Sequence, residues 1–128
     1  MLKGKLYLNN QECEGNYDFI NVAGTYMTQG FAEKFGDEAK EIVSKALWMI
    51  DEKYSNTADY LQTFVYELGD NKEDKIRFWM ILDEYKTGIH IVTALLPEEY
   101  YKIIYKTTRV IMRIWYNIYR NKEMEIKI

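Results

Sequence analysis

The sequence predicts an α+β fold, in which an antiparallel β-sheet (a meander) packs with one face against two amphipathic α-helices. Apolar residues recur at helical spacing over residues 37–55 and again over residues 97–121. Between them, three segments rich in aromatic and β-branched residues alternate in polarity and are separated by short polar turns. A chain of 128 residues without internal repeats predicts a single domain over 1–128.

The first third of the chain predicts short strands followed by a helix. Residues 3–8 and 17–22 have strand-like composition, turn signals separate them, and the glycine-bounded segment 24–30 could form another strand. Asp37 is a suitable N-cap for the first helix. Its apolar face, which Trp48 and Met49 widen, comprises Ala39, Ile42, Val43, Ala46, Leu47, Ile50 and Tyr54.

The middle of the chain predicts the three strands of the meander. These strands cover residues 60–68, 75–82 and 89–96, and the loops that join them have six residues or fewer. Loops of this length favour antiparallel hairpins. Residues 124–128 alternate in polarity and predict either a last edge strand or a frayed tail.

The second helix is predicted to be long, with a basic outer face. Pro97 suits the first helical position, and Glu98 and Glu99 place negative charge near the positive end of the helix dipole. The basic residues share a stripe about 60° wide, opposite the apolar side. This basic helix face comprises Lys102, Lys106, Arg109, Arg113 and Arg120.

Charge is distributed unevenly along the chain, whose formal net charge is −3. Residues 1–96 carry 10 Lys and Arg against 16 Asp and Glu, whereas residues 97–128 carry 7 against 4. The basic helix face could meet an anionic partner, or it could simply balance the acidic remainder of the fold. A weaker candidate surface, the acidic body, comprises Asp37, Glu38, Glu41, Asp70, Glu73, Asp74, Asp83 and Glu84.

Four short motifs resemble a family of uncharacterised proteins. They are YMTQG at residues 26–30, LWMIDE at 47–52, DYLQTF at 59–64 and TALLPEEY at 93–100. In this order they resemble the domain-of-unknown-function 960 family, small proteins of low-GC Gram-positive bacteria and their phages. The resemblance covers roughly residues 26–100, and the spacing between Phe64 and Ile81 is shorter than the family pattern. It implies an α+β fold and a bacterial or phage origin, and it brings no catalytic residues.

The sequence indicates no particular reaction, and we expect no cofactor and no metal site. The single histidine, His90, lies in a strand pattern, and a catalytic role would need a nucleophile or carboxylate brought close by the fold. The single cysteine, Cys13, has no basic neighbour that would lower its pKa. Paired carboxylates are common at turns and helix ends, and the sequence lacks a calcium-loop pattern.

We therefore expect a small non-catalytic protein of phage or mobile-element origin that binds a macromolecule. The partner is expected to be a protein, specifically a bacterial defence nuclease of the CRISPR type, whose positively charged channel could meet the acidic body. The alternatives are a nucleic-acid-binding accessory protein that uses the basic helix face, and a small enzyme with a site of carboxylates, tyrosines and His90.

Three further expectations concern the setting of the protein. The sequence contains neither a signal peptide nor a membrane-spanning segment, which predicts no membrane association. A lone cysteine fits a reducing compartment, so we expect a cytoplasmic location. Aromatic edges and a terminal strand make a homodimer a further expectation.

Overall fold

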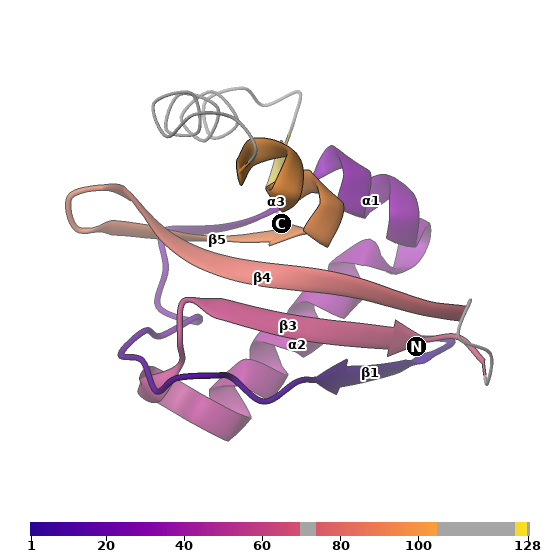
Figure 1. The fold of residues 1–128 in the computed structure, drawn as a ribbon, viewed down its shortest axis with the longest axis horizontal. Coiled ribbons are helices and arrows are strands. Elements are labelled where there is room, and N and C mark those ends of the chain that lie inside the picture. The colour runs from indigo at the N-terminus through magenta and orange to yellow at the C-terminus, as the bar shows by residue number, and fades with distance from the viewer. Residues whose placement is uncertain (70–73, 105–124, 128) are drawn as a thin grey trace.

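The computed structural model describes residues 1–69, 74–104 and 125–127, and the predicted α+β class is confirmed (Figure 1). The strands are β1 (Lys5–Leu8), β2 (Gly24–Thr28), β3 (Leu61–Glu67), β4 (Lys75–Lys86), β5 (Ile89–Leu95) and β6 (Glu125–Lys127). The helices are α1 (Gln29–Phe35), α2 (Ala39–Tyr54) and α3 (Pro97–Ile104), with short 3-10 turns at Gly36–Glu38 and Ser55–Thr57.

The six strands form one mixed sheet in the order β1-β3-β4-β5-β2-β6. The predicted meander β3–β4–β5 is antiparallel, but β2 pairs with β5 in parallel, so the expectation of a purely antiparallel sheet is wrong. The reason lies in the connection from β2 to β3. This connection contains α1 and α2, and such a helical crossover lets β3 run in the same direction as β2. Since β3 and β5 are both antiparallel to β4, β2 and β5 are parallel to each other.

Helix α1 was not expected from the sequence, which favoured a strand through Gly30. Strand β2 instead ends at Thr28, whose Oγ1 accepts a hydrogen bond from the N–H of Phe31 at 3.1 Å and so caps α1. The rings of Phe31 and Phe35 are buried against the sheet. Buried aromatic contacts therefore stabilise a helix of seven residues that would be marginal alone.

The predicted strand over residues 17–22 is absent from the structure, apart from one isolated bridge between Tyr17 and Ala58. Asp18 explains the difference. Its Oδ1 accepts hydrogen bonds from the N–H groups of Ile20 at 3.0 Å and Asn21 at 3.3 Å, which bend the backbone into a turn. These hydrogen bonds favour the ionised carboxylate and lower the pKa of Asp18, with the bond from Ile20 contributing most.

Helices α1 and α2 cover one face of the sheet and enclose the main core. The rings of Phe64 and Phe78 stack at 4.9 Å between centroids on this face. Helix α2 begins two residues after Asp37, which lies in the preceding 3-10 turn rather than at the N-cap. The predicted apolar face of α2 is confirmed in its buried residues Ala39, Ile42, Val43, Ala46 and Ile50.

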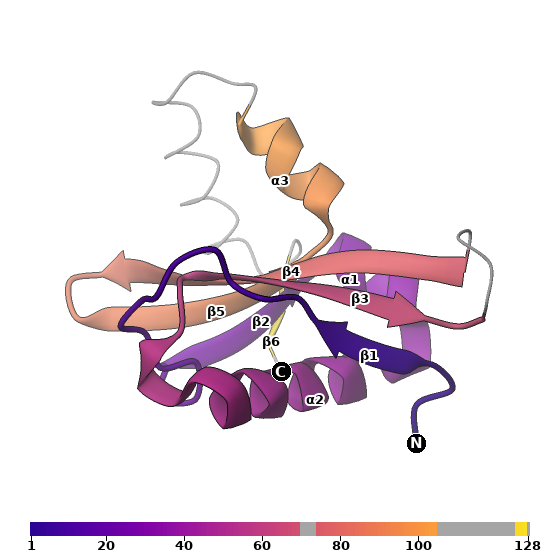
Figure 2. The same cartoon turned by 60° about the horizontal axis from the view of Figure 1, so that its bottom comes forward.

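Helix α3 lies on the opposite face of the sheet, so the expectation that the helices share one face is wrong (Figure 2). Tyr100 packs edge-on against Trp79 of β4, with ring centroids 5.3 Å apart. The predicted start at Pro97 is confirmed. The described helix ends at Ile104, and the predicted continuation over residues 105–121 lies outside the described residues.

The carboxylate of Glu99 connects the starts of two helices. Its Oε1 accepts hydrogen bonds from the N–H of Leu96 at 2.9 Å and from Oγ1 of Thr28 at 2.7 Å. The N–H of Glu99 in turn donates to the carbonyl of Leu96 at 3.0 Å. One negative charge therefore lies near the positive ends of both α1 and α3, where it stabilises each helix.

Candidate functional site

The basic helix face is largely outside the part of the chain that the structure describes. Lys102 belongs to α3, as predicted. The other four members, Lys106, Arg109, Arg113 and Arg120, lie outside the described residues. The predicted stripe of five cations therefore stays a prediction.

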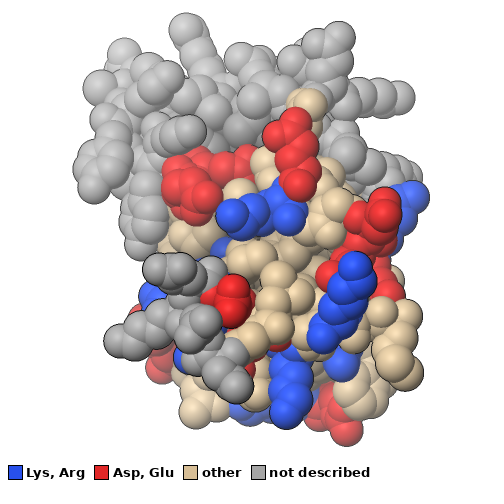
Figure 3. Space-filling view, turned by 90° about the vertical axis from the view of Figure 1, so that its right-hand side faces the viewer, with Lys and Arg blue, Asp and Glu red and all other residues tan. Residues whose placement is uncertain are grey.

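The described members of the acidic body do not form one surface. Asp37, Glu38 and Glu41 lie near the start of α2, at the end of the sheet where β4 begins after Asp74. Asp83 and Glu84 lie about nine residues further along β4, which corresponds to roughly 30 Å. Figure 3 views the end with the N-terminus and shows Lys and Arg beside Asp and Glu. Asp70 and Glu73 lie outside the described residues.

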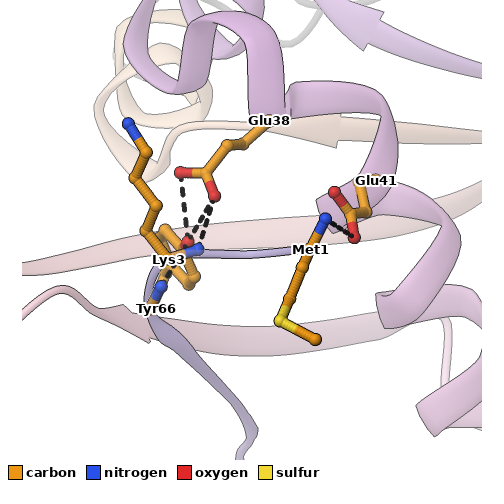
Figure 4. A network of polar contacts seen from close by, with 6 residues as sticks. Met1, Lys3, Glu38, Glu41 and Tyr66 are labelled. Atoms are coloured by element: carbon orange, nitrogen blue, oxygen red, sulfur yellow. Dashed lines mark hydrogen bonds and ion pairs between the residues drawn. The ribbon is translucent and has the colours of Figure 1, made fainter.

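Two of the carboxylates near the start of α2, Glu38 and Glu41, have the partners drawn in Figure 4. Glu38 accepts hydrogen bonds from the hydroxyl of Tyr66 at 3.0 and 3.1 Å and from the N–H of Lys3 at 2.8 Å. The Tyr66 hydroxyl also accepts a hydrogen bond from the N–H of Gly4 at 2.9 Å. Burial of the ring raises the pKa of Tyr66, and the Glu38 carboxylate raises it further. Glu41 pairs with the N-terminal amino group of Met1 at 3.3 Å.

His90 and Cys13 occupy exposed or half-exposed positions in different parts of the fold. Nε2 of His90 lies 3.7 Å from Oε2 of Glu84, and its ring meets the edge of Tyr17 at 6.2 Å between centroids. Cys13 is an exposed free cysteine in the loop after β1. Among the described residues, no group of three or more His, Cys, Asp or Glu side chains could hold a metal ion.

Strand β1 is the outermost strand on one side of the sheet, and part of its backbone is unpaired. The N–H of Asn9 donates to the carbonyl of Thr63 at 2.9 Å, and the register pairs Tyr7 with Val65. Since hydrogen-bonded pairs alternate along an antiparallel ladder, Leu6 and Leu8 direct their N–H and C=O groups away from β3. No described residue forms a hydrogen bond with these four groups.

A groove of about 400 Å³ lies between the β1 edge and helix α2. Helix α2 crosses beneath the sheet diagonally, and its C-terminal half emerges past this edge (Figures 1 and 2). Trp48 is exposed here at 60% of its full area, and Tyr7 is 45% exposed at the same edge, on the opposite face of β1 from Leu6 and Leu8. The groove is lined by Leu6, Tyr7, Leu8, Trp48, Met49, Glu52 and Lys53.

The sequence interpretation missed this groove because it placed Trp48 on the apolar face of the helix. The structure shows that this placement is wrong, since Trp48 is exposed. The spacing of residues along the helix already indicates that Trp48 is exposed. Nine residues at 100° each separate Trp48 from buried Ala39 by half a turn, which directs the indole away from the core. The exposure of Tyr7 is harder to predict from the sequence, because it depends on β1 being an edge strand.

Comparison of the chain with protein-family models, with curated proteins and with solved structures finds no match. The resemblance to the domain-of-unknown-function 960 family therefore stays a prediction. Within the described residues, no helix is both long and apolar enough to cross a membrane.

Proposed function

We propose that this chain is a small non-catalytic protein that acts by binding another protein at the groove between β1 and α2. The observation that carries the proposal is the exposure of Trp48 and Tyr7 beside unpaired backbone of an outermost strand. Exposed aromatic side chains are costly to leave in water and are enriched among the residues that dominate binding energy at protein interfaces. Unpaired strand edges are the other common attachment point for a partner.

Our proposal for the partner is a bacterial defence nuclease, which the protein would inhibit in the manner of a phage anti-CRISPR protein. The composition and the family resemblance support this part of the proposal. The contact surface is the groove rather than the acidic body, because the described acidic residues lie at two ends of β4 and Glu38, Glu41 and Glu84 are engaged within the fold. Binding through the groove then needs no continuous acidic surface.

The test is a nuclease-treated pull-down from bacterial lysate, read by mass spectrometry, with two matched variants. Tyr7→Ser removes an aromatic ring at the β1 edge that borders the groove, and Tyr60→Ser removes one of equal exposure, 45%, away from this edge. We expect wild type and Tyr60→Ser to retain one specific protein that Tyr7→Ser and Trp48→Ala lose.

Two results would overturn the proposal. One is the absence of any specific protein bound by wild type. The other is equal retention by Tyr7→Ser and Tyr60→Ser, which would place the contact elsewhere on the molecule. Thermal unfolding of all variants controls for loss of folding.

A further inference from the structure

We propose that the partner contributes an extended segment that adds to the sheet as an antiparallel strand beside β1. This inference rests on the proposed function and specifies how the groove is used. The bound segment would carry two apolar residues at alternate positions, followed directly by an acidic residue. Backbone, side-chain and charge observations each contribute one part of this description.

The unpaired backbone of β1 sets the register of the added strand. Leu6 and Leu8 each present one N–H and one C=O group away from β3. An antiparallel strand would exchange two hydrogen bonds with each of these residues, four in all. The residue of the added strand opposite Tyr7 then occupies a non-hydrogen-bonded position, where side chains approach most closely and ring contacts are favourable.

The side chains of the groove define the apolar positions. Residues directly opposite one another in a sheet point to the same face, so the two residues opposite Leu6 and Leu8 would point toward the α2 side. Leu6 is buried and Leu8 is half-buried in the core on that side. The emerging half of α2 presents Trp48 and Met49 to the same space. Apolar side chains at these two positions would remove the exposed indole from water.

Charge complementarity supplies the third feature. Lys5, Glu67 and Lys75 lie opposite one another across β1, β3 and β4, so charge alternates along this row. Glu67 pairs with Lys75 at 3.0 Å, and no described carboxylate lies within ion-pairing distance of Lys5 or of the neighbouring Arg77. An acidic residue opposite Lys5 would continue the alternation, since opposite charges across strands stabilise the pairing.

A second copy of this chain fits the edge less well than an acidic partner segment. Antiparallel self-pairing centred on Tyr7 would place Leu6 opposite Leu8 and satisfy the apolar positions. It would also place Asn9 opposite Lys5, so no negative charge would reach the exposed cations of this row. We therefore assign the edge to a segment of another protein, and homodimerisation becomes an outcome that the test can detect.

The test uses a phage-displayed library of random dodecapeptides selected on the full chain, with a matched pair of variants at position 8. Leu8→Pro removes an N–H that faces away from β3, which an edge strand tolerates, whereas Leu8→Val keeps that N–H. Selected sequences are then synthesised, and their affinity for each variant is measured by fluorescence anisotropy. Light scattering after size exclusion gives the oligomeric state of wild type and both variants.

We expect enrichment of the pattern apolar, any residue, apolar, acidic. Affinity should fall about tenfold or more in Leu8→Pro and in Trp48→Ala, and little in Leu8→Val, since a tenfold change corresponds to about one lost hydrogen bond with its burial. When the peptide library is selected on the Lys5→Glu variant, the acidic residue of the enriched pattern should be replaced by a basic one.

Three outcomes would overturn the inference. The first is that no peptide is enriched or that Leu8→Pro and Leu8→Val bind equally. The second is a wild-type dimer that Leu8→Pro converts to a monomer, which would assign the edge to a second copy. The third is a captured host protein that Leu8→Pro retains and Tyr7→Ser loses, which would leave the proposed function standing without strand addition.

Discussion

Replacing Tyr66 with phenylalanine removes one hydroxyl from the centre of the polar network in Figure 4. The ring of Tyr66 is buried, and its hydroxyl accepts from the N–H of Gly4 and donates to the carboxylate of Glu38. A neutral hydrogen bond contributes about 1 kcal/mol net and one to a charged group about 1.5–3 kcal/mol. Glu38 is half-exposed and can regain water, so we expect Tyr66→Phe to lower the free energy of unfolding by about 2 kcal/mol.

The pH dependence of this loss provides a second measurement. The pKa of Tyr66 is raised in the folded state, so the folded protein holds this proton more tightly than the unfolded chain does. The stabilising contribution is complete below the unfolded pKa of about 10 and is lost as pH rises through the folded pKa. The difference between wild type and Tyr66→Phe should therefore be constant up to about pH 10 and narrow as pH rises further.

Urea unfolding at pH 7 and at several alkaline pH values, followed by far-UV circular dichroism, measures both effects. Tyr60→Phe is the control, because Tyr60 is 45% exposed and its hydroxyl has no hydrogen bond to a described residue. A loss at pH 7 below about 0.5 kcal/mol, or a difference that is constant up to pH 11, would refute the role assigned to this hydroxyl.

Three further substitutions test the backbone and the capping carboxylates. Gly15→Ala should cost at least about 2 kcal/mol in urea unfolding, because its Cβ would clash with the carbonyl oxygen of Ala58; a near-neutral variant would contradict that close approach. Asp18→Asn should remove part of the acid sensitivity, since the lowered pKa of Asp18 stabilises the fold above about pH 4 and this contribution is lost as pH falls; unchanged acid unfolding curves would argue against it. Glu99→Gln should lower thermal stability by about 1 kcal/mol at pH 7 by removing a charge near two helix N-termini, and an unchanged melting temperature would contradict this role.

Local sequence signals predicted the elements whose residues decide their own conformation. The alternating residues of β3, β4 and β5 predicted that meander, although β4 continues to Lys86 through most of the loop expected over residues 83–88. The spacing of Ile42, Val43, Ala46 and Ile50 predicted α2, and Pro97 predicted the start of α3. In each case the buried face and the terminating residues lie within one segment, so the pattern is complete without knowledge of the rest of the chain.

The errors arise where distant residues decide the outcome. Helix α1 depends on the burial of Phe31 and Phe35 against Tyr66 and Phe78, which lie more than thirty residues away in the chain. The parallel pairing of β2 with β5 depends on where two helices return the chain. The groove was missed for the same reason, since it exists only because β1 is outermost and α2 emerges beside it.

The strand order has a consequence for the growing polypeptide during synthesis. The N-terminal segment supplies β1 and β2, which lie on opposite sides of the β3–β4–β5 meander and do not pair with each other. The first residue of β3 follows the last residue of β1 by 53 positions, and β5 follows β2 later still. At about 5–20 residues per second, β1 waits roughly 3–10 s for its partner. The ribosome therefore presents two unpaired strands to chaperones before the sheet can close.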